Sequence, residues 1–354
     1  MRVLMVGVDE QTKGGMWTVA ANYIYSKEFA EKTELKYIPT SITGSVVRRL
    51  MFTGKATAAV FCELLTKRYD IVHVHMAERG SVYRKNIVIN LAKLFGCKVI
   101  IHMHGAEFEQ WYQTLEKSRK DGVRKILNKA DKVIILGKYW ESFVKSLVSS
   151  DEKVAVVYNA VVVPDENKYN SDSNNMLFLG VVGQRKGVYD LLQAVKLIDS
   201  KLHEDVKLYI YGPDFEKKIE AAIAEQDLLA RVKYCGWLNA TEKEKVFSDT
   251  AVNILPSYNE GLPMTILECM AHGIPNISTN VAAIPEAVSN ENGIITEPGD
   301  VNHLAQAIEM MMSNREERST KSRNAFEDAK LRFSVDTHLA NMIDIYREVL
   351  GYNA

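Results

Sequence analysis

The sequence alternates short apolar, β-branched runs with segments of helical pattern along almost its whole length. Apolar strands that alternate with helices form parallel sheets covered by helices on both faces, so this pattern predicts an α/β fold. The strands expected in the first half are Arg2–Val8, 71–75, 98–104, 132–136 and 154–158. Those expected in the second half are 176–182, 206–212, 232–237, 251–257 and 274–279.

A polar stretch, DENKYNSDSNN from Asp165 to Asn175, interrupts this alternation and indicates a linker between two doubly wound units. The 354 residues suffice for two domains of roughly 150 residues each. We predict a first domain over 1–165, a second over 166–333, and a helix over 334–354 that could pack on either, with the first preferred. Ligands of such sheets bind beyond the carboxyl ends of the strands, so we expect the site in a cleft between facing units.

The amino-acid composition excludes a few broad classes of protein and does not identify the function. A formal net charge of -1 gives no support to nucleic acid as a partner. No apolar run reaches the roughly 18 residues of a membrane span, and RVLMVGV is too short for a signal sequence. The four cysteines at 62, 97, 235 and 269 are widely spread in apolar surroundings, which predicts buried thiols in a reducing compartment. We therefore expect a cytoplasmic protein, and peripheral contact with the inner face of the cell membrane stays open.

The segment PSYNEGLPMTILECMAHGIP, Pro256 to Pro275, is the most informative for function. Glu260 precedes a predicted helix whose first residue is expected to be Pro263, and Glu268 lies about a turn and a half inside it. Backbone amides at such a helix start, aided by the dipole, can bind a phosphate; they belong to Gly261, Leu262, Met264 and Thr265. Carboxylates on both sides suit a ligand with a sugar, a diphosphate and a ribose. An ordinary helix with an acidic first turn is the alternative.

Other candidates lie at predicted strand ends. After the first strand, Gly14 and Gly15 would let the backbone approach a phosphate, although paired glycines also simply make turns. His104 ends a later strand, where the following glycine would let it project into the cleft. For His73 and His75 we prefer a structural role. In the second half, Lys186 lies in a loop between a strand and a helix and could reach a diphosphate.

The order of these motifs resembles the retaining glycosyltransferases of the GT-B fold, family 4. The motifs are the GG loop, HxHG, VYNAVVVP, LGxxxxxKG, VKYCGW and PSxxEGLPxxxLECMAxGxP. The match spans nearly the whole chain and is most specific from Val232 to Pro298. The resemblance implies two Rossmann-like domains facing across a cleft.

The resemblance also assigns roles to single positions. It implies that Glu260 approaches the donor sugar, that Glu268 binds the ribose hydroxyls, and that Lys186 contacts the donor diphosphate. It implies that His104 lies near the donor sugar. Gly14 and Gly15 match a loop that closes over the donor, and Trp237 and Leu238 fall where the backbone meets the nucleobase. Members of this family need no metal or other cofactor, and the chain contains no convincing DxD motif.

One position departs from the family pattern. The arginine usually found directly after the glycine that closes the strand is replaced here, because Gly180 is followed by Val181. A charged hydrogen bond of this kind is worth roughly 1.5 to 3 kcal/mol. Either Arg185 supplies the charge from the loop, or donor binding is weaker, or the protein no longer transfers sugar.

The acceptor is less constrained by the sequence. Aromatic and apolar residues recur at helical spacing after the HxHG turn and precede a basic stretch; they are Phe108, Trp111, Tyr112 and Leu115. Such a stripe could rest on an anionic membrane and present a lipid-linked acceptor, but it is more often part of a core.

Three functions follow in order of preference. The first is a hexosyltransferase that builds a surface polysaccharide or glycolipid from a UDP-sugar or GDP-mannose. The second is a sugar-nucleotide-binding protein without transferase activity. The third, a dinucleotide oxidoreductase, is disfavoured because the first strand does not lead into a glycine-rich dinucleotide fingerprint.

Overall fold

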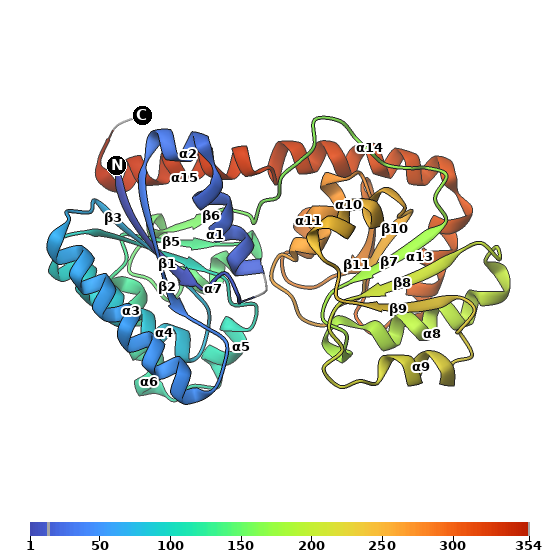
Figure 1. Ribbon diagram of the computed structural model, residues 1–354, viewed down its shortest axis with the longest axis horizontal. Helices are drawn as coiled ribbons and strands as arrows, with labels where there is room; N and C mark the ends of the chain where they lie inside the picture. The colour runs from blue at the N-terminus through green and yellow to red at the C-terminus, as the bar shows by residue number, and fades with distance from the viewer. Residues whose placement is uncertain (13–14, 353–354) are drawn as a thin grey trace. The chain divides into compact units, whose positions relative to one another are not determined.

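The chain folds into two compact units, which are described separately here (Figure 1). The computed structural model describes residues 1–12 and 15–352. Unit 1 comprises Met1–Ala160 and Val335–Ala354, and unit 2 comprises Val161–Ser334. Among the described residues, no helix combines the length and the apolar character needed to cross a bilayer.

Unit 1 is built on a parallel six-stranded sheet of order β2-β1-β3-β4-β5-β6. Register places His75 of β3 opposite His102 of β4. Because the strands run parallel, the loops after β1 to β4 leave the sheet at one edge. The strands are β1 (Arg2–Val8), β2 (Glu34–Ser41), β3 (Ile71–Met76), β4 (Lys98–Met103), β5 (Lys132–Ile135) and β6 (Val154–Val156).

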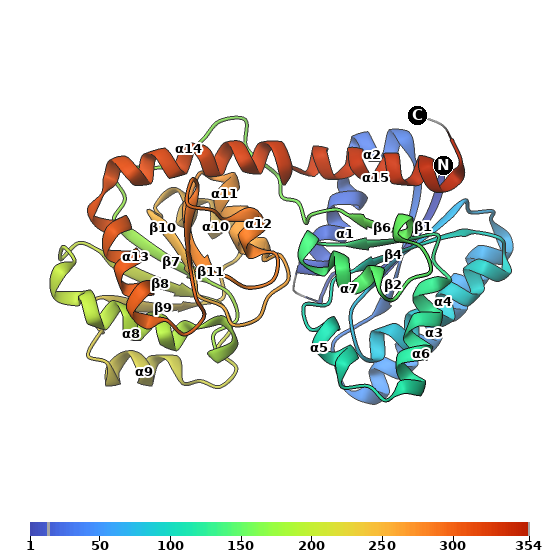
Figure 2. The same ribbon diagram turned by 180° about the vertical axis from the view of Figure 1, so that it is seen from behind.

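Helices cover both faces of this sheet, with α3, α4 and α6 on one and α1, α2 and α15 on the other (Figures 1 and 2). The C-terminal helix α15 therefore belongs to unit 1, where the Lys132 ammonium binds the Glu348 carboxylate at 2.6 Å. The helices are α1 (Gly15–Tyr25), α2 (Lys27–Lys32), α3 (Val46–Thr66), α4 (Gly80–Leu94), α5 (Phe108–Gln113), α6 (Lys117–Asn128), α7 (Glu141–Lys145) and α15 (Val335–Leu350), with 3-10 helices η1 (Lys138–Trp140) and η2 (Asp151–Lys153).

Unit 2 repeats this architecture with a parallel sheet of order β12-β11-β10-β7-β8-β9. The strands are β7 (Asn175–Leu179), β8 (Lys207–Tyr211), β9 (Val232–Gly236), β10 (Val252–Leu255), β11 (Asn276–Thr279) and β12 (Gly293–Thr296). α8 packs against α13, and α11 packs against α14. The helices are α8 (Val188–Ile198), α9 (Ile219–Glu225), α10 (Ala240–Ser248), α11 (Met264–Ala271), α12 (Ile284–Ala287), α13 (Val301–Ser313) and α14 (Arg315–Arg332), with 3-10 helices η3 (Gln184–Lys186) and η4 (Asp199–Lys201).

The α/β class and the two doubly wound sheets are confirmed, but two strands were not expected. β2 contains Pro39, and β12 has only four residues. Both lie at the edge of their sheet, where a strand needs fewer apolar residues and tolerates proline. Weak apolar signal is therefore the reason that the pattern missed them.

The polar stretch Asp165–Asn175 is packed onto unit 2 along part of its length. The Asn167 amide donates to the Ser322 hydroxyl at 3.2 Å, and the Tyr169 hydroxyl donates to the Ala251 carbonyl at 2.9 Å. Among the cysteines, Cys97 and Cys269 are buried as expected, whereas Cys62 is exposed on α3.

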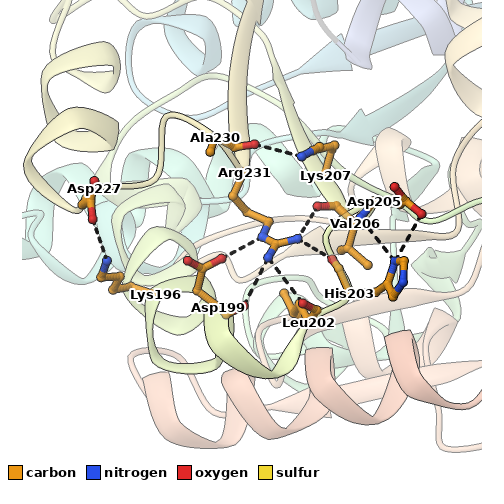
Figure 3. Close-up of polar contacts among 10 residues, drawn as sticks. All are labelled: Lys196, Asp199, Leu202, His203, Asp205, Val206, Lys207, Asp227, Ala230 and Arg231. Atoms are coloured by element: carbon orange, nitrogen blue, oxygen red, sulfur yellow. Dashed lines mark hydrogen bonds and ion pairs between the residues drawn. The ribbon is translucent and has the colours of Figure 1, made fainter.

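The amino edge of the unit 2 sheet is held by Arg231, which precedes β9 (Figure 3). Its guanidinium binds the Asp199 carboxylate at 2.7 Å and donates to the carbonyls of His203 and Val206 at 2.6 and 2.7 Å. These bonds tie the connection between α8 and β8 to one side chain, so Arg231 fixes this turn.

Candidate functional site

The loops after two adjacent strands of unit 2 bring Lys186 and Glu260 together. Lys186 follows β7 and Glu260 follows β10, and these strands are neighbours in the sheet. The Lys186 ammonium binds the Glu260 carboxylate, and the Ser257 hydroxyl donates to the same carboxylate oxygen at 2.9 Å. The side chains are only 14% and 8% exposed. The pair thus lies at the carboxyl edge, where ligands of such sheets bind.

Gly187 allows the two loops to approach each other. Its φ of +70° is left-handed, and a Cβ there would lie 1.9 Å from the Pro256 carbonyl oxygen. The Tyr258 amide donates to the Arg185 carbonyl at 2.9 Å across the same contact. Only glycine fits this position, so the loop sequence Lys186-Gly187 is a requirement of the local geometry.

Burial governs the electrostatics of Lys186. It lowers the pKa of the ammonium below its ordinary value of 10.5, while the Glu260 charge and hydrogen bond oppose this shift. Arg185 adds a smaller lowering effect. Lys186 is thus a desolvated cation whose charge depends on an adjacent anion, a state in which Coulomb interactions are strong.

The helix after Glu260 begins one residue later than the sequence predicted. Pro263 has a ψ of 126° and caps α11, which starts at Met264. The prediction that Pro263 is the first helical residue is therefore wrong, because only its φ is helical. The amides of Met264 and Thr265 lie in the first turn, before the first intrahelical hydrogen bond. Gly261 and Leu262 lie in the preceding turn.

Glu268 lies in the second turn of α11 and has a partner of its own. Its carboxylate binds the Lys243 ammonium of α10 at 2.6 Å, with about a fifth of its side chain exposed. Trp237 and Leu238 directly follow β9; Trp237 is 51% exposed and Leu238 is buried. The structure thus brings Arg185, Lys186 and Glu260 into one cluster, and it pairs Glu268 with a cation from another helix.

Val181 occupies an accessible position after β7 and is 39% exposed. Arg185, the candidate substitute for the missing arginine, donates from its guanidinium to the Asn259 carbonyl at 2.9 Å. This bond fixes the guanidinium on the loop that carries Glu260. A cation is therefore present beside Lys186, although it comes from a different backbone position.

In unit 1, His104 is the partly buried member of a histidine cluster whose other members, His73, His75 and His102, are buried. A hydrogen bond of 2.7 Å joins its Nε2 to the Nδ1 of His75, and its ring lies 4.3 Å from that of His102. Burial lowers the pKa of His104 to about 3, with smaller contributions from His338 and Lys85. The imidazole is therefore neutral at ordinary pH and can act only as a hydrogen-bond donor and acceptor.

His73, His75 and His102 bring ring nitrogens within 4.8 Å of one another. Their rings stack, with centroids 4.7 to 5.4 Å apart and planes within 26°. His73 bonds the Tyr346 hydroxyl of α15 at 2.6 Å and His102 at 3.3 Å. Stacked rings do not converge on one point as metal ligands do, so this geometry supports the structural role that we preferred.

The remaining predicted residues of unit 1 fall on tight backbone. A Cβ at Gly105, the residue after His104, would lie 2.0 Å from the Glu78 carboxylate and 3.0 Å from the Glu78 backbone nitrogen, so a larger residue there would displace the Glu78 side chain. Gly15 is the first residue of α1. Gly14 lies outside the described residues.

The aromatic stripe packs largely inward. Phe108 and Tyr112 are 1% and 5% exposed, and α5 ends at Gln113, before Leu115. Two of the four residues therefore belong to the core of unit 1, whereas Trp111 and Leu115 are partly exposed, and the use of the stripe as a membrane face stays a prediction.

Sequence reasoning missed a groove of about 540 Å³ in unit 1. It lies where the loops after β1 and β2 meet the start of α3, and it is lined by Asp9, Gln11, Arg48, Met51 and Lys55, among others. These are the carboxyl ends of the two strands, so the groove is in the position of a ligand site. The signal was lost because β2 was not predicted.

Two family models match the chain. Residues 35–160 match "Glycosyl transferase 4-like domain", and residues 163–328 match "Glycosyl transferases group 1". The two matches are adjacent and follow the division into units.

Individual proteins are similar over most of the chain. A protein of Klebsiella pneumoniae, described as an uncharacterized 41.2 kDa protein in the cps region, is 24% identical over 86% of this chain and 89% of its own. An Escherichia coli enzyme, "UDP-Gal:alpha-D-GlcNAc-diphosphoundecaprenol alpha-1,3-galactosyltransferase", is 26% identical over 72% of this chain and 69% of its own. The structure of Anabaena HepE in complex with UDP-glucose has a TM-score of 0.76 over 98% of this chain and all of that one, with 16% identity.

Proposed function

Because this chain belongs to the glycosyl transferases group 1 family, we propose that it moves a sugar from a nucleoside diphosphate sugar to a glycan or lipid-linked acceptor, with retention of configuration. The observation that carries this proposal is the buried Lys186–Glu260 pair at the carboxyl edge of the unit 2 sheet. A cation held by an anion in a desolvated position suits a ligand that combines a diphosphate with a sugar.

The reaction separates charge, and the residues of unit 2 match that separation. When the bond between the anomeric carbon and the diphosphate breaks, positive charge develops on the sugar ring and negative charge on the leaving group. Lys186 and the amides at the start of α11 stabilise the leaving group. The acceptor hydroxyl oxygen forms the new bond on the same face, and a phosphate oxygen takes its proton. Glu260 orients the sugar and is not a nucleophile.

The remaining contacts with the donor are assigned from the positions of the residues in the family motifs. Glu268 binds the ribose hydroxyls, and its contact with the Lys243 ammonium fixes the position of the carboxylate. The backbone at Trp237 and Leu238 meets the base. His104, with Gly14 and Gly15, contributes from unit 1, and Arg185 supplies a second cation for the diphosphate. As the resemblance to this family implies, the proposed reaction is metal-independent.

We place the reaction in surface polysaccharide or glycolipid biosynthesis, at the cytoplasmic side of the membrane. Support comes from the relative in the cps region and from the relative whose name includes a diphosphoundecaprenol acceptor. The groove beside Arg48 and Lys55 in unit 1 is the candidate acceptor site, because two cations suit an acceptor that carries phosphate.

A sugar-nucleotide-binding protein without transferase activity is the second candidate, because Val181 stands where the family has an arginine. Donor binding is tested first by thermal shift with UDP-glucose, UDP-galactose, UDP-N-acetylglucosamine, GDP-mannose and NAD. Stabilisation by NAD alone would refute the glycosyltransferase proposal.

Turnover is then tested with the stabilising donor, in the presence of EDTA, by release of the nucleoside diphosphate with and without acceptor. We expect Glu260→Ala to abolish turnover and Glu268→Ala to weaken donor binding mainly. Unchanged turnover in Glu260→Ala would overturn the assignment, and donor binding without turnover on any acceptor would favour the second candidate.

A further inference from the structure

We propose that the outward face of α3 docks on an anionic lipid bilayer. This surface is distinct from the donor site, which lies in unit 2, and the docking step does not depend on the proposed reaction. Neither the aromatic stripe of α5 nor any other described helix needs to enter the membrane for it.

The first turns of α3 expose large apolar side chains to an unusual degree. Val46, Val47, Leu50 and Met51 are 67%, 67%, 65% and 61% exposed. The same helix exposes Leu65 by 62% near its other end. Single exposed apolar residues are ordinary, but a contiguous set on one element indicates an interaction surface.

These residues form one stripe along the helix. At 100° per residue, Val46, Leu50, Phe61 and Leu65 fall within a sector of roughly 100°, and Met51 lies beside it. Gly54, Ala58 and Cys62 continue the exposed side between them. The buried side of α3 is formed by Ala56, Val60 and Leu64. The helix therefore has a buried apolar side and an exposed one. On the exposed side Phe61 packs edge-on against Phe95 at 5.9 Å between ring centroids, whereas Val46, Val47, Leu50 and Met51 are largely exposed.

The charged side chains in the first three turns of α3 are all cations, and the groove beside them contributes one carboxylate, Asp9. Arg48, Arg49 and Lys55 are exposed within the first three turns. Glu63 is the carboxylate of α3; it lies near the opposite end and is bound to Tyr69 and Lys67 at 2.6 and 3.0 Å. An apolar stripe flanked by cations is the pattern of a helix that lies in the interface of an anionic membrane.

The charge pattern also argues against a second copy of the chain as the occupant. A two-fold contact through this stripe would bring the same surface of both copies together. Arg48, Arg49 and Lys55 would then face their own equivalents, and the groove lining beside them supplies one carboxylate, Asp9, against these three cations. Anionic headgroups provide more of the complementary charge than a second copy does.

Docking through α3 would also place the groove of unit 1 at the membrane surface. Val47, Arg48, Met51 and Lys55 belong both to this helix and to the groove lining. On the proposed function, an acceptor with an apolar anchor and a phosphate could enter the groove without leaving the bilayer. This consequence rests on the proposed reaction, whereas the docking itself does not.

Co-sedimentation of the full chain with vesicles tests the docking. We expect binding to phosphatidylglycerol/phosphatidylcholine vesicles, little binding to pure phosphatidylcholine, and release by high salt. Val47→Glu/Leu50→Glu should abolish binding. Arg48→Glu/Arg49→Glu should weaken it about thirtyfold or more, since each cation near such a surface contributes about a factor of five. Leu229→Glu, at a 73% exposed position of unit 2, is the matched control and should bind like the original protein.

A label on Cys62 gives an independent readout. In a Cys235→Ser background, Cys62 is the exposed thiol, because Cys97 and Cys269 are buried. An environment-sensitive fluorophore there should shift to the blue with anionic vesicles and not with neutral ones.

Three results would overturn the proposal: no binding of the original protein to anionic vesicles, binding retained in Val47→Glu/Leu50→Glu, or a dimer in sedimentation equilibrium that this double variant dissociates. Circular dichroism checks that each variant is folded, and donor hydrolysis is measured on the original protein. If docking fails while donor hydrolysis persists, only this inference fails. If hydrolysis is absent while docking persists, the proposed function fails.

Discussion

Replacing Glu260 by glutamine keeps the shape of the side chain and removes its charge, so it tests how strongly Lys186 depends on that charge. The two side chains are 14% and 8% exposed. Removing one partner of a fully buried ion pair costs about 3 to 5 kcal/mol, because the other charge is left without compensation. Lys186 retains some access to water and can release its proton, so we expect a loss of about 2 kcal/mol in the stability of unit 2.

The pH dependence of this loss identifies its cause. Burial already lowers the pKa of Lys186, and Glu260 opposes that shift. In Glu260→Gln the pKa of Lys186 should fall further, so between that value and 10.5 the unfolded chain binds more protons than the folded one. The stability of the variant then rises with pH in this window. The difference from the original protein should therefore be largest near neutral pH and shrink towards pH 10.

Urea unfolding followed between pH 6 and pH 10 measures this difference. Glu309→Gln is the matched control, because Glu309 pairs with Lys201 at 2.8 Å while both side chains are more than a third exposed. An exposed pair contributes at most about 1 kcal/mol. If Glu260→Gln destabilises unit 2 no more than Glu309→Gln, or if its effect is independent of pH, the view of Lys186 as a desolvated, Glu260-dependent cation is wrong.

Four further outcomes are expected. Glu268→Gln should raise the Kd for the donor about tenfold or more and leave turnover at saturation within a few-fold, measured by calorimetry and kinetics; an equal loss in both would contradict a ribose-binding role. Val181→Arg should lower the donor Kd about tenfold, and an unchanged Kd would indicate that Arg185 already supplies that charge. Arg231→Lys should destabilise unit 2 by about 3 kcal/mol in urea unfolding without changing donor Kd, because a lysine cannot reproduce its several carbonyl bonds (Figure 3). Burial lowers the pKa of His104 to about 3 and that of His338 to about 4, so unit 1 should lose stability as pH falls below about 6.5 towards 4, and tryptophan fluorescence that stays unchanged over this range would refute the buried-neutral assignment.

The sequence predicted the central strands because buried parallel strands are mostly apolar along their length. Ile71–Met76 and Val252–Leu255 are buried at every position, and their polar residues are His73, His75 and Asn253. The edge strands β2 and β12 escaped prediction since they are short, partly exposed or interrupted by proline. Because β2 was not predicted, the groove of unit 1 was not predicted either. A ligand site at the end of a strand can be located only after the strand itself has been located.

The candidate site residues could also be predicted only in part. From the residues alone, Lys186 and Glu260 were separate candidates at predicted strand ends, and the resemblance to the glycosyltransferase family assigned them to one donor site. Their direct contact could not be derived, since it depends on the left-handed Gly187 and its approach to Pro256. The partner of Glu268, Lys243, lies on another helix, and no local pattern links residues 25 positions apart. Likewise, the sequence of α3 is that of an ordinary amphipathic helix. Which of its apolar residues are exposed cannot be predicted before the buried side is known.

Residues at the carboxyl edge of the unit 2 sheet are expected to serve function, and Arg231 at the amino edge is expected to serve stability. At the carboxyl edge, Lys186 and Glu260 leave a desolvated charge pair where a ligand can replace part of the protein's own interactions, so substitutions there should change donor binding and turnover. At the amino edge, the hydrogen-bonding groups of Arg231 are bound to the turn that precedes β8 and to Asp199. A group whose donors are all bound by the fold has little left to offer a substrate. In a parallel sheet the carboxyl ends of the strands lie along one edge, and the ligand-binding loops follow them there. Arg231, which has a structural role, therefore lies at the opposite, amino edge.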